Sequence, residues 1–339
     1  MAESPASGVD PAASITESVA LLREPSYRLL QPARYGGRAI SRSASEAANF
    51  VTAVATLAER DGSLGWLAAA VNTAAHLVGG LGDSASEQVW GADAAALVTS
   101  AGGHTGTLTA DAGNFRLTGH WQDVTGALSA DWLLVSAMEG DSARYVLIPR
   151  DAVQVDRQAG PRGLDSAGIG AVTASDALVD AKAVFPVPAD NSCHTADSGD
   201  SGPGYEVLAG AGQAAAVVGA AAGVWLAHVG QVRQRLATSY GSEDTTELTS
   251  SAVLVARAES DIDAARLQLV RSVDVDTPTA AAAAAQCQAV TRARNAADQL
   301  LSSGNRHALD AADPVARQWF DVLAGYRLTI RSVEHPAVC

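Results

Sequence analysis

Apolar positions recur with a helical period at both ends of the chain. From residue 15 to about residue 90 this spacing predicts two or three helices, interrupted where a proline and paired glycines force a turn in residues 31–37. After residue 205 the helical period returns in four long stretches, at residues 206–239, 246–272, 278–303 and 313–332. Four helices of this length predict an antiparallel bundle.

Between the two helical regions the period shortens to that of strands. Residues 114–118 alternate polar and apolar, and short apolar runs bounded by turns follow at residues 132–137, 145–148, 153–156 and 171–176. Closely spaced strands of this kind predict a small antiparallel barrel or sandwich. Strands and helices do not alternate, and no glycine-rich nucleotide fingerprint follows a strand, which argues against a Rossmann domain.

The patterns divide the chain into five segments and predict an α+β fold class. A small acidic lead-in (1–14), which we expect to be disordered, precedes an N-terminal helical domain (15–96). A central small antiparallel β-barrel domain (97–185) follows, and then a linker loop rich in Pro, Gly, Ser and Asp (186–204). The C-terminal four-helix bundle (205–339) completes a chain that is long enough to bury a cofactor.

Composition excludes several classes of protein. The net charge of −14, with no basic run, argues against nucleic acid or an anionic membrane as a partner. Cys193, Cys287 and Cys339 are far apart and belong to no Cys/His cluster, so we expect neither a metal site nor a disulfide framework. The first residues lack the apolar core of a secretory signal, which predicts a cytoplasmic protein. The most apolar stretch, residues 207–229, is rich in Ala and Gly and predicts a buried helix rather than a membrane span.

Four short segments match the motifs of one family at the corresponding places in the chain. They are PARYGG at 32–37, DGSLGW at 61–66, GHWQDVTG at 119–126 with ADW at 130–132, and GLDSAGIG at 163–170. With the order helices, β domain and bundle, they make the chain resemble the acyl-CoA dehydrogenase superfamily. The resemblance is closer to the two-component (group D) flavin-dependent monooxygenases, which include phenol-type hydroxylases and amino-sugar N-oxygenases.

The resemblance implies a site for FAD or FMN at the β domain. In the family, the tryptophan and the hydroxyl residue of the third motif meet the flavin ring, and here these are Trp121 and Thr125, followed by Gly126. An indole can pack on the isoalloxazine face while a hydroxyl bonds its reactive edge, although a buried core tryptophan would also explain Trp121. Thr99 and Ser100 lie in the loop whose backbone reaches the flavin in relatives.

Two further pairs of residues have implied binding roles. Arg233 and Arg235 occupy the region of the first bundle helix where relatives place an arginine against the flavin phosphates. A solvated helix face is the competing interpretation. Ser63 and Trp66 belong to the second motif, which lies near the substrate in the monooxygenases. A kinked helix with a core tryptophan is the alternative there.

The catalytic base is less well specified. The hydroxylases carry a histidine in the last bundle helix, where this chain has Gly-Tyr-Arg-Leu at 325–328, and the glutamate of the dehydrogenases has no evident counterpart. His120, His76 and His104 are the remaining candidates, and each is also explained as a structural hydrogen-bonding residue. In the fourth motif, Ala167 and Ile169 replace hydroxyl residues of the family, which weakens any side-chain contact from those positions.

Our leading hypothesis is therefore a monooxygenase component that takes reduced flavin from a separate flavin reductase. It would use dioxygen to hydroxylate a small aromatic or amine substrate. One alternative is an acyl-CoA dehydrogenase-like desaturase of a CoA-bound or carrier-bound acyl group. Another is a non-catalytic or partner subunit that retains the fold. The resemblance also implies a homo-oligomer, either a tetramer or a dimer.

Overall fold

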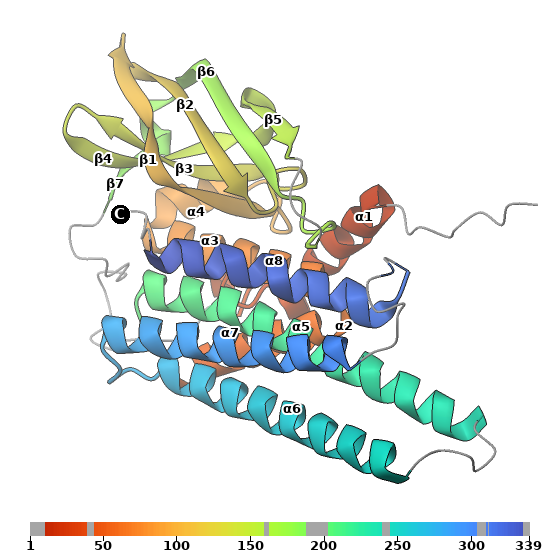
Figure 1. Ribbon diagram of the computed structural model, residues 1–339. Helices are drawn as coiled ribbons and strands as arrows, with labels where there is room; N and C mark the ends of the chain where they lie inside the picture. Colours follow the sequence, from red (N-terminus) through yellow and green to blue (C-terminus); the bar gives the residue numbers. More distant parts are fainter. Residues whose placement is uncertain are drawn as a thin grey trace, which may run out of the picture.

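The computed structural model describes residues 11–38, 44–158, 163–187, 203–238, 245–303, 310 and 312–334. A β domain stands on one side of a thick layer of helices, and the helix farthest from it is α6 (Thr245–Ser272) (Figure 1). Most of the expected disordered lead-in and of the expected linker loop lies outside the described residues.

The N-terminal region contains four helices, α1 (Pro11–Leu22), α2 (Ala44–Arg60), α3 (Gly62–Gly80) and α4 (Asp83–Trp90). The helix α3 begins at Gly62 because the Asp61 side chain accepts a hydrogen bond from the backbone nitrogen of Leu64, at 3.0 Å, and so caps its first turn. The sequence predicted two or three helices in this region, but the described residues form four, the last of which, α4, has only eight residues.

The β domain is one seven-stranded sheet with the order β5-β6-β2-β1-β3-β4-β7. Its strands are β1 (Val98–Asp111), β2 (Asn114–Val124), β3 (Trp132–Glu139), β4 (Ser142–Pro149), β5 (Gln154–Arg157), β6 (Gly170–Val179) and β7 (Val184–Pro186). Each of the five runs predicted as strands overlaps one of these elements, and only the run at 153–156 begins one residue early, since β5 starts at Gln154. The prediction of a small β domain between helices is confirmed.

The sheet differs from the prediction in one respect, because it is mixed rather than purely antiparallel. The strand β1 pairs in parallel with β3, with Val98 opposite Trp132, while the other five pairings are antiparallel. Among the described residues, the short edge strands β5 and β7 do not pair with each other, so hydrogen bonds do not close the sheet into a ring. The first half of β1 was expected to be a loop, because its Gly, Ser and Thr residues give no alternating apolar pattern.

The four predicted bundle helices are present as α5 (Tyr205–Thr238), α6, α7 (Thr279–Ser302) and α8 (Pro314–Glu334). The helix α5 packs tightly against α2, since a Cβ atom at Gly219 would lie 2.2 Å from the carbonyl oxygen of Ala55. Among the described residues, α5 is the one helix long and apolar enough to cross a membrane, but 83% of its most apolar window is buried inside the protein. It is a core helix, as its Ala and Gly content predicted.

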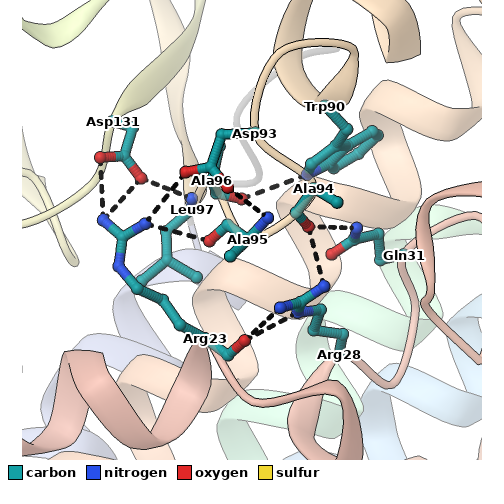
Figure 2. A network of polar contacts seen from close by, with 10 residues as sticks. All are labelled: Arg23, Arg28, Gln31, Trp90, Asp93, Ala94, Ala95, Ala96, Leu97 and Asp131. Atoms are coloured by element: carbon teal, nitrogen blue, oxygen red, sulfur yellow. Dashed lines mark hydrogen bonds and ion pairs between the residues drawn. The ribbon is translucent and has the colours of Figure 1, made fainter.

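A network of polar contacts joins the end of α1 to the β domain (Figure 2). Arg23 donates from Nη2 to both carboxylate oxygens of Asp131, each at 2.9 Å, and from Nη1 to the carbonyl oxygen of Ala95, at 3.1 Å. Asp131 also accepts a hydrogen bond from the backbone nitrogen of Leu97, at 2.7 Å. Because Leu97 precedes β1 and Asp131 precedes β3, this one carboxylate aligns the starts of the two parallel strands.

A second contact joins α8 to the β domain. The buried carboxylate of Asp321 accepts a hydrogen bond from the backbone nitrogen of Leu164, at 2.6 Å. The preceding residue, Gly163, has a φ of +107°, and a Cβ atom there would lie 2.2 Å from the carbonyl oxygen of Phe320. Only glycine therefore allows the chain to approach α8 this closely.

The environment of Asp321 favours its neutral form. Burial raises the pKa of Asp321 from 3.8 to about 7, and the negative charges of Asp61 and Asp165 act in the same direction. The hydrogen bond from Leu164 opposes this increase. The unfolded chain therefore releases this proton near pH 4, whereas the folded chain holds it up to about pH 7, and folding stability is lost as the pH rises between these values.

Removing the Asp131 carboxylate tests the first contact. Because three hydrogen bonds from two donor groups are lost, Asp131→Ala should lower the unfolding free energy by about 1–2 kcal/mol, a value discounted for the partial exposure of the pair. Chemical denaturation measures this change. Arg34→Gln, which breaks an exposed ion pair with Asp83, is the control and should cost less than about 0.5 kcal/mol. Equal losses in the two variants would contradict the assignment.

Replacing Asp321 by an asparagine tests the second contact. The amide still accepts the hydrogen bond from Leu164 but does not titrate. Between pH 5 and pH 8 the wild type should lose about 3 kcal/mol of unfolding free energy relative to Asp321→Asn. Denaturant melts across this range measure the difference, with the exposed Asp176→Asn as control. Parallel pH profiles for the wild type and Asp321→Asn would show that this carboxyl is not the titrating group.

Candidate functional site

A cavity of about 390 Å³ opens between the β domain and α8. Its volume lies in the range of small-molecule sites. It is lined by Asp123, Arg157, Gln158, Gly163, Leu164, Asp165, Ile169, Ala324, Arg327, Leu328 and Arg331. Residues of the third and fourth sequence motifs, far apart in the chain, thus meet the last bundle helix at one cavity.

The lining combines apolar side chains with charges. Leu164 and Ile169 come from the fourth motif, and Ala324 and Leu328 lie one turn apart on α8. Arg327 and Leu328 belong to the stretch in which the family's histidine was sought, so one arginine and one apolar side chain line the cavity there. The three arginines and two aspartates of the lining give a formal charge of 3 − 2 = +1, although the whole chain carries −14.

The backbone at Asp123 is shaped to bring this residue to the cavity. Asp123 has a φ of +55°, and the pairing of β2 with β6 shifts register between Trp121 and Val124. Such a bulge redirects a side chain, and a positive φ is uncommon outside glycine. The Asp123 carboxylate accepts from Nη1 of Arg331 at 2.8 Å, and its backbone nitrogen donates to the Gln158 side chain at 2.9 Å.

Three of the predicted site residues are brought together beside the cavity. Nε1 of Trp66 donates to Oγ1 of Thr125 at 2.9 Å, and the Thr99 hydroxyl donates to the backbone oxygen of Thr125 at 2.5 Å. An indole nitrogen can only donate, so the hydroxyl hydrogen of Thr125 is left for another acceptor. The Trp66 ring lies against Gly325, whose neighbour Ala324 lines the cavity. Thr125 itself is not among the lining residues.

Trp121 lies elsewhere. Its side chain is only 2% exposed, its indole nitrogen donates to the backbone oxygen of Ser136 at 3.1 Å, and its ring packs against Gly106 and Gly119 inside the sheet. The structure therefore favours the core interpretation of Trp121 over the predicted flavin contact. The polar and apolar alternation of β2 explains this position, because one face of the strand must fill the core.

None of the three candidate histidines lines the cavity with a described side chain. His120 lies exposed on β2, next to the inward-facing Trp121, and its Nδ1 atom is 2.9 Å from Oγ1 of Thr173. His76 is half-buried on α3, ten residues after Trp66 and thus about 15 Å along the helix. The side chain of His104 lies outside the described part of the chain.

The remaining predicted residues are also outside the cavity lining. Ser63 is buried in the first turn of α3, and the hydroxyl of Ser100 lies 3.3 Å from the hydroxyl of Tyr205. Arg233 and Arg235 are exposed near the end of α5. Their roles in binding substrate or flavin remain predictions.

Sequence reasoning missed the charged residues of the lining. Asp123 falls inside the third motif, which gave a signal for it, but the motif assigns no role to that position. Arg157 and Arg331 are solvent-facing residues of a strand and a helix, and nothing in their local sequence distinguishes them from surface arginines. Only the folded chain brings β5 and α8 to the same cavity.

Comparison with known proteins gives the same picture. Residues 211–330 match the model of the acyl-CoA dehydrogenase C-terminal domain. The oxygenase subunit HsaA of a flavin-dependent monooxygenase from Rhodococcus jostii is 27% identical over 321 residues, covering 88% of this chain and 83% of HsaA. The oxygenase component of an FADH2-dependent resorcinol hydroxylase from Rhizobium is 25% identical over 88% of this chain and 79% of its own.

A solved structure agrees. The crystal structure of HsaA from Mycobacterium tuberculosis superposes with a TM-score of 0.78 at 25% identity, over 96% of this chain and 94% of that one. The helices, mixed sheet and bundle of the present chain are therefore shared along nearly its whole length. The chain has the fold of the acyl-CoA dehydrogenases, its residues 211–330 match their C-terminal domain, and it is similar over most of its length to the oxygenase subunits of two-component flavin-dependent monooxygenases.

Proposed function

We propose that the chain is the oxygenase component of a two-component flavin-dependent monooxygenase that hydroxylates a small aromatic substrate. The observation that carries the proposal is the convergence of two motif segments and α8 on one cavity, in a chain similar over 88% of its length to such oxygenase subunits. Both relatives described above are named as monooxygenases or hydroxylases, which favours this reaction over a dehydrogenase.

The residues at the cavity suit a flavin. Apolar side chains from the fourth motif and from α8 suit a flat ring, and the free hydroxyl hydrogen of Thr125 suits a ring nitrogen or oxygen beside it. Arginine side chains of the lining suit the anionic phosphates of FMN or FAD. When bound, reduced flavin supplies the two electrons with which one atom of dioxygen enters the substrate and the other leaves as water.

The protein's own contribution is to exclude water and to orient groups. Part of the cavity is apolar, because it is lined by Leu164, Ile169, Ala324 and Leu328. An apolar wall keeps water away from the reacting groups. Asp165 also lines the cavity and has no hydrogen-bond or ion-pair partner among the described residues, so its carboxylate is free to accept a proton from a substrate hydroxyl. Asp123 is instead held by Arg331.

The proposal includes partners and setting. A separate flavin reductase supplies the reduced FMN or FAD, as the phrase "oxygenase component" in the names of relatives implies. We also propose that the chain works in the cytoplasm as a homo-oligomer, for which the family resemblance is the support.

Isotope transfer tests the reaction. The full chain is supplied with a flavin reductase, NADH, either FMN or FAD, ¹⁸O-labelled dioxygen and a panel of phenols and aromatic amines. Mass spectrometry should find one ¹⁸O atom in a product, and only when the chain is present. Formation of hydrogen peroxide alone across the panel, with flavin bound, would argue against a monooxygenase that acts on these substrate classes.

The Thr125 hydroxyl gives a residue-level test. Thr125→Val should weaken binding of reduced flavin by about tenfold, the loss of one hydrogen bond of about 1.4 kcal/mol, whereas Thr125→Ser should bind within about threefold of the wild type. Titration under anaerobic conditions measures this. Thr173→Val, on the outer face of β6, is the matched control and should leave binding unchanged. Equal affinities for Thr125→Val and Thr125→Ser would remove Thr125 from the flavin site.

A further inference from the structure

Two arginines of the cavity lining have no partner within the described part of the protein. Arg157 ends β5 and Arg327 lies on α8, so they reach the cavity from different elements. The side chain of neither residue forms a hydrogen bond or an ion pair with another described residue. The third arginine of the lining, Arg331, differs from them because Asp123 binds it at 2.8 Å.

The surroundings of these two arginines favour an anion. The cavity carries a formal charge of +1 inside a protein of −14, so it is a local positive region on an acidic chain. Guanidinium groups bind carboxylates and phosphates through paired hydrogen bonds, and two of them on separate elements can clasp one group. A local positive potential also raises the concentration of anions at the cavity entrance.

The rest of the lining defines the other end of the ligand. Leu164 and Ile169 belong to the β domain, and Ala324 and Leu328 to α8, so apolar surface comes from both components of the cavity. A ligand that satisfies the whole lining has an apolar ring and an anionic group. A volume of about 390 Å³ is in the range of sites that bind small molecules with such rings.

We propose that Arg157 and Arg327 together bind the anionic group of a ring-shaped ligand in this cavity. The reaction that would follow in this cavity rests on the proposed function. The binding of an anion by the two arginines does not. The anionic group has two possible sources, the carboxylate of an acidic aromatic substrate and the phosphate of the flavin. Both present the same paired oxygen atoms to the guanidinium groups.

Two matched pairs of ligands distinguish the sources. Titration calorimetry with the full chain compares 4-hydroxybenzoate with its neutral amide, and FMN with riboflavin, which lacks the phosphate. In at least one pair, the wild type should bind the anionic ligand at least ten times more tightly than the neutral one. A preference in the first pair identifies an acidic substrate, and one in the second pair identifies the flavin phosphate.

Variants connect the preference to the two arginines. Arg157→Gln and Arg327→Gln should each reduce the preference for the anionic ligand at least fivefold, and the double variant should abolish this preference. Arg271→Gln removes an exposed arginine at the end of α6 whose side chain likewise lacks a described partner, and it should leave the preference for the anionic ligand intact. Circular dichroism confirms that each variant is folded.

The proposal is overturned if the wild type shows no preference in either pair, or if the preference survives in the folded double variant. The outcome of the ¹⁸O experiment does not depend on the outcome of these binding measurements. An anion preference that depends on Arg157 and Arg327, without ¹⁸O transfer, would leave the binding site in place and remove the oxygenase assignment.

Discussion

The close approach of α8 to the segment around Gly163 is the constraint on which the cavity depends. The Asp321 carboxylate holds the backbone of Leu164 at 2.6 Å, and the absence of a side chain at Gly163 lets the two elements meet. The cavity begins beside this contact, with Gly163, Leu164 and Asp165 on one side and Ala324 on the other. The carboxyl group of Asp321, whose pKa is raised by burial, therefore lies next to residues that line the candidate site.

The helices were the most predictable part of the fold. Long stretches with a period of 3.6 residues place α5 to α8 within about two residues of their observed bounds, because burying one face of a helix imposes that period. The strands β2 to β6 were found for the corresponding reason. The first half of β1 was missed because it pairs with β3, more than thirty positions along the chain, and its own Gly, Ser and Thr residues carry no strand pattern.

The candidate site was predictable only where a motif carried it. Trp66, Thr99 and Thr125 were singled out separately, and the structure brings them together through two hydrogen bonds. The motif also singled out Trp121, but its packing inside the sheet is a property of the whole domain that a local match does not contain. The arginines of the cavity were out of reach for a similar reason, since surface arginines on β5 and α8 acquire a common role only when the two elements meet.

The carboxylate of Asp131 has a consequence for how the protein folds. Its contact with Leu97 spans 34 positions of the chain and its contact with Arg23 spans 108, so both form only after distant segments have met. Parallel pairing is intrinsically slow for this reason, since the entropy of closing a long loop is lost before the strands gain any contact. Because one carboxylate binds both Arg23 and Leu97, the position of the first helix and the alignment of β1 with β3 are coupled in the folded protein. A change at the end of α1 is therefore felt at the start of the parallel pair, in the β domain.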